Sequence, residues 1–344
     1  MSKTYSNLQP KDIVILAIES SCDETSASVI KNARILSNCI ANQSIHEKYG
    51  GVVPELASRE HQKNIIPVVD QALKDAQITQ KELNAIAFTR GPGLLGSLLV
   101  GTSFAKAVAL GLDIPLIEVQ HMQAHVLAHF IEMPQPCFPF LCLTVSGGHT
   151  QIVLVKDYLD MEIIGQTQDD AVGEAFDKTA KMLGLPYPGG PLVDRYAQLG
   201  NPQAYSFPDI DMPGLNYSFS GIKTAILYFL RDQSAKNPDF IQNNLNDICA
   251  SVQYSLVNIL LKKLKKASKL YKIKEIAIAG GVSANSELRR RIAEEGQNLG
   301  WKVYIPDFQY CTDNAAMIAI TAYYKYLRGD FTNQEASPMP RMGF

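Results

Sequence analysis

The sequence predicts an α/β protein built from two lobes, and three observations support this fold class. The chain has 344 residues, more than the roughly 250–300 at which a single hydrophobic core usually stops growing. Short apolar runs of strand length alternate with stretches of helical spacing, as in βαβ units. A strand–turn–strand hairpin of the same plan opens each half, at residues 13–30 and 140–155. This repetition indicates internal duplication, with a nucleotide clamped between the lobes.

The boundary between the lobes is expected where prolines interrupt the helical pattern. Pro134, Pro136 and Pro139 stand close together, and proline disfavours continuation of a helix. We therefore assign residues 1–133 to an N-terminal lobe and residues 134–344 to a C-terminal lobe. We expect the last helix to pack back toward the first lobe.

Composition indicates a cytoplasmic globular protein without membrane contact. Hydrophobic residues make up 46% of the chain and the formal net charge is −2, so attraction to nucleic acid would have to come from a local patch. The most apolar region, 94–117, contains Lys106 and Asp113 and suits a buried helix better than a membrane span. The six cysteines form no Cys-x-x-Cys pair, which predicts reduced and mostly buried thiols.

The first hairpin carries a turn rich in hydroxyl and carboxyl groups. An apolar strand at 13–18 and a returning strand at 26–30 flank it. The turn is either a phosphate and metal-ion loop or a solvated hairpin tip; the candidate phosphate-loop residues are Ser21, Cys22, Asp23 and Glu24.

The rest of the first lobe reads as a strand at 36–41, a helix at 54–76, a strand at 83–89, a helix through 105–110 and a strand at 115–119. The helix at 54–76 carries His61. We expect His61, like His46, to be a surface or helix-face residue rather than a ligand, because nothing local converges on it. The glycines of 91–97 allow close backbone approach, either to a ligand or within a tight turn.

The second lobe repeats the strand, turn and strand over 140–145, 146–150 and 151–155. A helix is expected to begin within 169–178, where Glu174 and Asp177 either form a charged helix face or accept hydrogen bonds from a ribose or amino acid. Proline and glycine predict a loop at 187–191.

A long amphipathic helix is expected at 248–274, after a helical run at 222–230, and its polar side is basic. Such lysines usually form a solvated face; the functional alternative is a patch that holds nucleic-acid phosphates. A buried strand at 275–279 leads to a Gly-Gly turn, after which Asn285 could bond a base or ribose. The last long helix, 315–326, follows Asp313, whose local pattern favours a helix cap.

His121 and His125 are four residues apart on a predicted helix, so both imidazoles can reach one metal ion. Zinc peptidases carry His-Glu-x-x-His, in which the glutamate is the general base. Met122 occupies that position here, and a thioether cannot take a proton from water. The pair therefore favours a metal that holds and polarises a ligand.

Taken together, these motifs resemble the tRNA N6-adenosine threonylcarbamoyltransferase family of bacterial type, formerly called O-sialoglycoprotein endopeptidases, from about Ile13 to Gly329. The resemblance rests on ordered motifs: Glu-Ser-Ser-Cys-Asp-Glu-Thr from Glu19, Gly-Pro-Gly from Gly91, His-Met-Gln-Ala-His from His121, Val-Ser-Gly-Gly-His-Thr from Val145, Gly-Glu-Ala-Phe-Asp-Lys from Gly173, Tyr-Pro-Gly-Gly-Pro from Tyr187, Ser-Phe-Ser-Gly from Ser218, Gly-Gly-Val-Ser-Ala-Asn from Gly280 and Cys-Thr-Asp-Asn from Cys311. Ser20 and Asn216 depart from the family pattern, which often has threonine and aspartate there.

The resemblance implies the two-lobed actin-like fold of sugar kinases and heat-shock chaperones. It implies one divalent metal ion bound by His121, His125 and Asp313, with Fe²⁺ favoured and Zn²⁺ as the other candidate. It also implies a substrate and nucleotide pocket lined by Thr144, Val145, Ser146, Gly147, Gly148, Asp177, Gly190, Asp194 and Asn285.

The implied reaction transfers threonylcarbamoyl from threonylcarbamoyl-AMP to N6 of an adenosine beside the anticodon, in tRNAs that read codons beginning with A. No general base is evident in the sequence, so positioning and electrostatics would carry the rate. The implied partners are the tRNA anticodon loop, a smaller non-catalytic paralogue and a P-loop ATPase subunit.

Three alternatives come from other functional classes. An actin-like ATPase or small-molecule kinase would leave the histidine pair without a purpose. Scaffold paralogues lack the histidine pair, which this chain has. A peptidase needs the glutamate, which Met122 replaces here.

Overall fold

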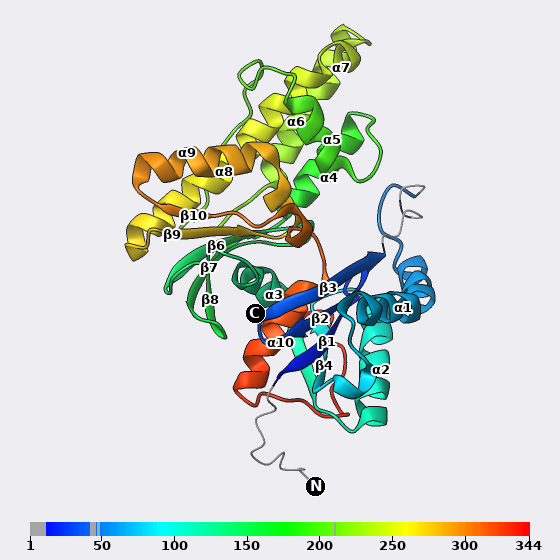
Figure 1. Ribbon diagram of the computed structural model, residues 1–344. Helices are drawn as coiled ribbons and strands as arrows, with labels where there is room; N and C mark the ends of the chain where they lie inside the picture. The colour runs from blue at the N-terminus through cyan, green and yellow to red at the C-terminus, as the bar shows by residue number, and fades with distance from the viewer. Residues whose placement is uncertain (1–11, 42–45, 47–48, 210) are drawn as a thin grey trace. The chain divides into compact units, whose positions relative to one another are not determined.

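The computed structural model describes residues 12–41, 46, 49–209 and 211–344, which divide into two compact units (Figure 1). The first unit contains the described residues up to 41, Pro54–Ala124 and Asn314–Gly343, and the second contains His125–Asp313 with the few described residues of 46–53 and Phe344. The chain thus leaves the first unit after Ala124 and returns to it at Asn314. By contrast, the boundary placed at the prolines assigned everything after residue 133 to one lobe.

The first unit is built on a mixed five-stranded sheet in the order β3-β2-β1-β4-β5. The pairs β1–β2 and β2–β3 are antiparallel, whereas β1–β4 and β4–β5 are parallel. The strands are β1 (Val14–Glu19), β2 (Thr25–Lys31), β3 (Arg34–Ala41), β4 (Ala85–Gly91) and β5 (Leu116–Gln120).

The second unit repeats this plan in the order β10-β9-β6-β7-β8. Its pairs β6–β7 and β7–β8 are antiparallel and β6–β9 and β9–β10 are parallel. The strands are β6 (Phe140–Val145), β7 (Thr150–Asp157), β8 (Asp160–Gln166), β9 (Glu275–Ala279) and β10 (Lys302–Tyr304). Identical strand order and direction confirm the predicted duplication.

Helices cover both faces of the first sheet (Figure 1). Val14, Leu16 and Ile18 of β1 share a core with α1 (Pro54–Ala76) and α2 (Leu95–Leu112), while α10 (Ala315–Leu327) packs on β1 and β2. Successive residues of a strand point to opposite faces, so a strand covered on both sides is a continuous apolar run. This explains why β1 shows no polar alternation. A short 3-10 turn, η2 (Gln80–Glu82), precedes β4.

Among the described residues, α2 is the one helix long and apolar enough to cross a membrane by length and composition, and a third of it is buried. Leu98, Ala105 and Ala109 are buried in the first unit, whereas Leu95, Leu99 and Leu110 are exposed. The predicted buried helix is therefore correct for one face only.

In the second unit, α8 (Leu245–Tyr271) runs through the core, and its buried side includes Leu256, Leu260 and Leu264. The other helical elements are η3 (Ala128–Phe130), α4 (Val172–Met182), α5 (Gly189–Ala197), α6 (Ser220–Lys236), α7 (Phe240–Asn243), η4 (Gly281–Ala284), α9 (Ser286–Leu299) and η5 (Phe308–Tyr310). The prediction of a loop at 187–191 is wrong for its second half, because Gly189, Gly190 and Pro191 form the first turn of α5. Proline is tolerated there, since the first amides of a helix have no partner within it.

All six cysteines are free thiols, as predicted, but fewer are buried than expected. Cys142, Cys249 and Cys311 are buried, Cys22 and Cys39 are half-buried, and Cys137 is exposed.

Candidate functional site

His121 and His125 lie on α3 (His121–Leu127), which begins immediately after β5. The side-chain oxygen of Gln120 accepts a hydrogen bond from the backbone N–H of Gln123 at 2.7 Å and so caps the first turn. Both histidines are buried. The helix therefore carries the two imidazoles away from water on one face, as the four-residue spacing predicted.

Asp313 lies just before α10, and it does not act as the cap that the local sequence favoured. Asn314 caps the helix instead, because its side-chain oxygen accepts from Met317 N at 3.1 Å. Ser26 Oγ accepts from Ala315 N at 2.8 Å, which fastens the start of α10 to β2. Asp313 Oδ1 lies 3.2 Å from His125 Nε2.

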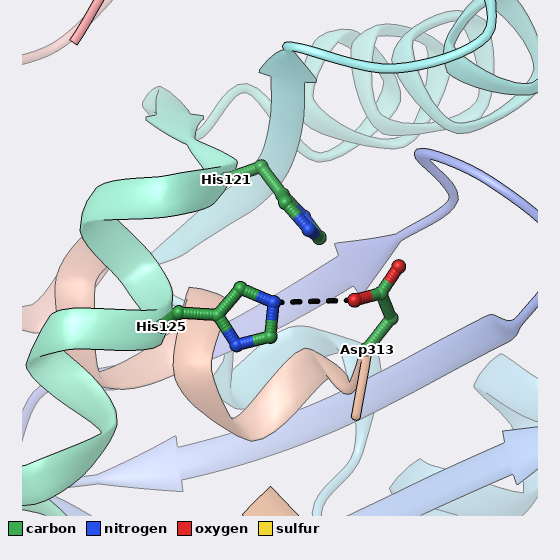
Figure 2. Close-up of side chains that lie close together, drawn as sticks. All are labelled: His121, His125 and Asp313. Atoms are coloured by element: carbon green, nitrogen blue, oxygen red, sulfur yellow. Dashed lines mark hydrogen bonds and ion pairs between the residues drawn. The ribbon is translucent and has the colours of Figure 1, made fainter. Parts of the chain in front are cut away.

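The ligand atoms of His121, His125 and Asp313 all lie within 4.8 Å of one another (Figure 2). Ligands bound at about 2.0–2.1 Å to one tetrahedral ion lie roughly 3.4 Å apart. The His125–Asp313 distance already has this size. Two imidazole nitrogens and one carboxylate oxygen suit Fe²⁺ and Zn²⁺ alike and leave coordination positions for a substrate. The residues present therefore fit a single divalent ion.

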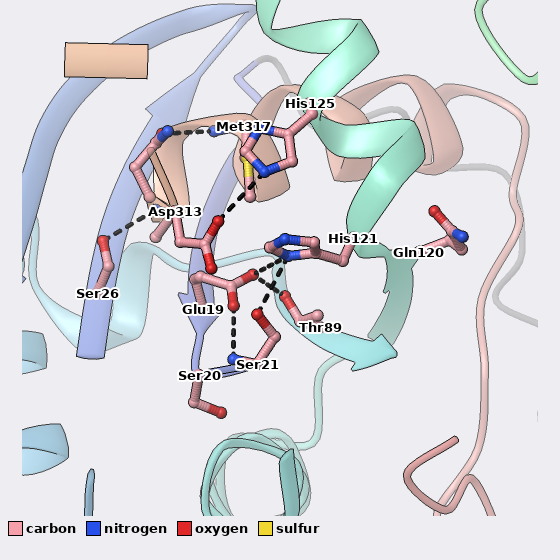
Figure 3. A network of polar contacts seen from close by, with 12 residues as sticks. Glu19, Ser20, Ser21, Ser26, Thr89, Gln120, His121, His125, Asp313 and Met317 are labelled. Carbon is pink, nitrogen blue, oxygen red and sulfur yellow. Dashed lines mark hydrogen bonds and ion pairs between the residues drawn. The ribbon is translucent and has the colours of Figure 1, made fainter. Parts of the chain in front are cut away.

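A buried carboxylate lies beside His121, and sequence reasoning did not identify it. Glu19 Oε2 lies 3.2 Å from His121 Nδ1, and Ser21 Oγ lies 3.3 Å from the same nitrogen (Figure 3). Glu19 ends β1, and His121 follows β5. Both strands run parallel to β4, so their carboxyl ends lie at the same edge of the sheet and bring the two residues together. A glutamate closing an otherwise apolar strand was the signal that could have revealed it.

The turn after β1, which holds the phosphate-loop candidates, is not a solvated hairpin tip. Ser21 is buried, and Cys22, Asp23 and Glu24 are half-buried. Leu94 N, at the start of α2, donates to Ser21 O at 2.7 Å. A Cβ atom on Gly93 would lie 2.4 Å from Ser21 O, so glycine is required for this approach. The glycine-rich segment 91–97 thus packs against the turn.

His61 and His46 are both buried, so neither is a surface residue, although His61 does lie on a face of α1 as the other expectation had it. His61 Nδ1 is 2.8 Å from Thr25 Oγ1, and its Nε2 is 3.0 Å from Cys22 O. His46 Nδ1 accepts from Val53 N at 3.3 Å. His61 joins α1 to the turn at Cys22 and to the start of β2 at Thr25, contacts between residues distant in sequence that no local pattern indicates.

Of the candidate pocket residues, Thr144 to Gly148 span the end of β6 and the turn after it. Thr144 and Val145 are buried strand residues, Ser146 is half-buried, and Gly147 and Gly148 are exposed in the turn. A Cβ on either glycine would meet no atom within 4 Å. The open side of this turn is therefore backbone that a ligand can approach.

The remaining pocket candidates gather at two helix starts in the second unit. Asp177 Oδ1 accepts from Gly189 N at 3.0 Å and from Gly190 N at 2.9 Å, where α5 begins. Burial raises the pKa of Asp177, although these two amides oppose the rise. Asp194 accepts from the backbone N and hydroxyl of Ser286 at the start of α9.

Asn285 caps α9, because its Oδ1 accepts from Leu288 N at 3.0 Å. Its Nδ2 donates to Gln253 Oε1 at 2.8 Å. Asn285 and Asp194 therefore meet at the α9 start, while Asp177 and Gly190 meet at the α5 start. The structure brings these candidates together in pairs.

Three lysines on the basic side of α8 are paired with acidic groups. Lys262 contacts Asp209 at 2.8 Å, Lys265 contacts Glu295 at 2.8 Å, and Lys263 is buried beside Asp211. A cavity of about 220 Å³ near this helix, lined by residues such as Tyr205 and Tyr254, contains none of the predicted site residues. Lys262, Lys266 and Lys269 are exposed, as expected for a solvated face, whereas Lys263 is buried.

Comparison with known proteins gives this arrangement a family. The model of the tRNA N6-adenosine threonylcarbamoyltransferase family matches residues 34–320. A protein of Cytophaga hutchinsonii with that name is 62% identical over 334 residues, covering 97% of each chain. One of Christiangramia forsetii is 60% identical over 340 residues, covering 98% of this chain and all of that protein.

Among solved structures, full-length HypF with bound phosphate and nucleotide is similar with a TM-score of 0.63 and 15% identity, over 93% of this chain and 47% of that one. This likeness concerns the fold alone and agrees with the two-lobed actin-like architecture. The family match and the two relatives together show that the chain belongs to the tRNA N6-adenosine threonylcarbamoyltransferase family.

Proposed function

We propose that this chain uses threonylcarbamoyl-AMP as donor and one metal ion held by His121, His125 and Asp313. Family membership makes the chain an acyltransferase that forms threonylcarbamoyladenosine on tRNA. The observation that supports the metal proposal is the convergence of the three ligand atoms within 4.8 Å. The kinase alternative is not favoured, because relatives at 60–62% identity carry the transferase name.

The acceptor is an exocyclic adenine amine, which is a weak nucleophile, so the acyl group must arrive activated. A mixed anhydride with AMP meets this need. A bound Fe²⁺ or Zn²⁺ would supply orientation of the donor and stabilisation of developing negative charge. Both imidazoles are buried, which limits their contact with bulk water. We favour Fe²⁺, with Zn²⁺ as the other candidate.

The donor pocket is proposed to consist of Thr144 to Gly148, Asp177, Gly190, Asp194 and Asn285. Support comes from the exposed backbone of Gly147 and Gly148, and from carboxylates at the α5 and α9 starts. Helix starts present amide donors suited to phosphate, and a carboxylate suits ribose hydroxyls. Ser21, Cys22, Asp23 and Glu24 are the further phosphate-contact candidates.

Acceptor recognition is proposed to involve the anticodon loop, whose single-stranded bases are accessible without breaking a duplex. We further propose cytoplasmic action together with a smaller non-catalytic paralogue and a P-loop ATPase subunit. These partners would supply the activated donor and a complete tRNA surface.

The test is reconstitution of the full chain with tRNA, threonine, bicarbonate, ATP and the two partner proteins, followed by nucleoside analysis. We expect threonylcarbamoyladenosine from the native chain and a loss of about 100-fold or more in the His121→Ala, His125→Ala and Asp313→Ala variants. Metal content, measured on the same samples, should fall with activity.

Gln123→Ala is the matched control, because it alters the same helix between the two histidines and leaves both imidazoles in place. It should retain metal and activity. Full metal occupancy in Asp313→Ala would refute the third ligand, and modified tRNA from a metal-free native chain would refute the role of the ion.

A further inference from the structure

Glu19 is a fully buried carboxylate that lies beside His121, one of the proposed metal ligands. Its exposed fraction is 0%, although an ionised carboxylate is almost never buried without a partner. Oε1 accepts a hydrogen bond from Ser21 N at 2.6 Å, and Oε2 accepts one from Thr89 Oγ1 at 2.5 Å. Two donors directed at the carboxylate oxygens suit a group that acts only as an acceptor.

The same Oε2 lies 3.2 Å from His121 Nδ1 (Figure 3). A neutral imidazole carries one N–H, and an acceptor beside Nδ1 places that hydrogen on Nδ1. The lone pair then lies on Nε2, the nitrogen available to a metal ion. Metal-bound histidines commonly have such a carboxylate on the other ring nitrogen, which fixes the tautomer and ring orientation.

The backbone around Glu19 is fixed by the start of α2. Ser20 Oγ donates to Ser97 O at 3.0 Å, and Leu94 N donates to Ser21 O at 2.7 Å. A Cβ on Gly101 would come within 2.3 Å of Ser20 Oγ, so the helix approaches the strand end closely. The two residues that follow Glu19 are therefore both tied to the start of α2, which restricts the position of the Glu19 carboxylate.

We propose that Glu19 is a positioning residue that holds His121 in the Nδ1–H tautomer and directs its Nε2 toward the metal ion. This inference rests on the proposed metal site. It assigns no contact between Glu19 and the ion or the substrate. His125 is oriented differently, since its Nε2 faces Asp313.

Glu19→Gln is the decisive variant, because it keeps the size of the side chain and an oxygen for Ser21 N. Its amide can donate to Nδ1, which would move the imidazole hydrogen to Nε2 and remove the lone pair from the metal position. Loss of such an orienting partner typically weakens metal affinity 10–100-fold. We expect a loss of this size for Zn²⁺, measured by competition with a chelator in the full-length chain.

Nitrogen-15 NMR of histidine-labelled, metal-free protein reports the tautomer directly, a readout that a merely structural role would not change. The native chain should show His121 with hydrogen on Nδ1, and Glu19→Gln should show it on Nε2. His121→Ala serves to identify the His121 signal. Thermal unfolding without metal establishes that each variant is folded.

Glu118→Gln is the matched control, because Glu118 is a half-buried carboxylate in the same unit that pairs with Arg90 at 2.7 Å. It should change Zn²⁺ affinity by less than about twofold. The Glu19 proposal is overturned if Glu19→Gln binds Zn²⁺ as tightly as the native chain, or if native His121 carries its hydrogen on Nε2. Failure of the proposed metal site would differ from failure of the Glu19 proposal alone, because His121→Ala would then also bind Zn²⁺ as tightly as the native chain.

Discussion

His121, His125 and His129 follow one another at four-residue intervals, yet their surroundings give them different roles. His129 is buried in η3, and its Nε2 donates to Ile278 O at 2.9 Å. Burial lowers its pKa to about 4, although the hydrogen bond to the backbone opposes this shift. His129 is therefore a neutral core residue that joins η3, the turn directly after α3, to β9.

Stability of the second unit should fall as the solution is acidified. The pKa of His129 is about 4 in the folded chain against an ordinary value of 6.5, so the unfolded chain binds a proton first. Between about pH 6.5 and 4 each unit of pH then costs up to roughly 1.4 kcal/mol. Urea unfolding at pH 7.5 and pH 5 measures the loss.

His129→Gln is the control for this pH dependence, since it keeps a donor for Ile278 O and removes the titration. The variant should lose less stability than the native chain over the same interval. Equal losses in both proteins would show that another group causes the acid sensitivity.

At the scale of elements, helix starts are where the functional candidates gather. Asn314 caps α10, Asn285 caps α9, and Asp177 accepts the first amides of α5. The first amides of a helix need external acceptors, and the same amides can bind anions. A side chain that supplies such an acceptor restricts the backbone of the residue next to it. Asp313, which precedes the cap residue Asn314, contacts His125 of α3.

Asn314 and Asp313 are adjacent, but substitution of Asn314 should lower stability, whereas substitution of Asp313 should lower metal affinity. Asn314→Ala removes the cap of α10 and should lower the free energy of unfolding by about 1 kcal/mol. Asp313→Asn keeps the shape of the side chain and the cap, so metal-free stability should change by less than about 0.5 kcal/mol. Its Zn²⁺ affinity should nevertheless fall, because a neutral amide is a poorer ligand.

Denaturant unfolding without metal and chelator competition with Zn²⁺ separate these two effects. Asn314→Asp is the rescue variant, since aspartate caps as well as asparagine. A loss of metal-free stability in Asp313→Asn equal to that of Asn314→Ala would mean that Asp313 also supports the helix start.

At the scale of the whole molecule, the last part of the sequence completes the first unit. Residues from Ala315 to Ala322 of α10 are buried, and Ala315 N bonds to Ser26 on β2. Beyond the helix, Thr332 N donates to Leu116 O at 2.8 Å and Met339 N donates to Arg90 O at 2.8 Å. Each of these contacts joins residues more than two hundred positions apart.

A chain truncated after Asp313 should lose the folded first unit, because the sheet face under α10 would be exposed. A chain truncated after Gly329 keeps α10 and should retain that unit with reduced stability. Limited proteolysis with mass spectrometry identifies which segments resist cleavage. Protection of residues 54–124 in the shorter chain would show that the unit folds without its C-terminal part.

Much of the fold was predictable because it depends on local patterns. Apolar runs at 13–18 and 275–279 identified β1 and β9, and helical spacing predicted α1 with its observed bounds of Pro54 and Ala76. The turn at 187–191 was less predictable, since proline and glycine also begin helices when their amides have an outside acceptor, here Asp177.

The sequence by itself determined the duplicated α/β plan, the two histidines on one helix face and the resemblance to the family, because these follow from residue spacing and ordered motifs. Only the tertiary structure decided that Glu19 contacts His121 and that His61 is buried, and it shows the contact of Asp313 with His125 that the resemblance implied and residue spacing did not. Such contacts join segments separated by tens to hundreds of residues. Strand order and helix packing create them, and no local periodicity encodes that arrangement.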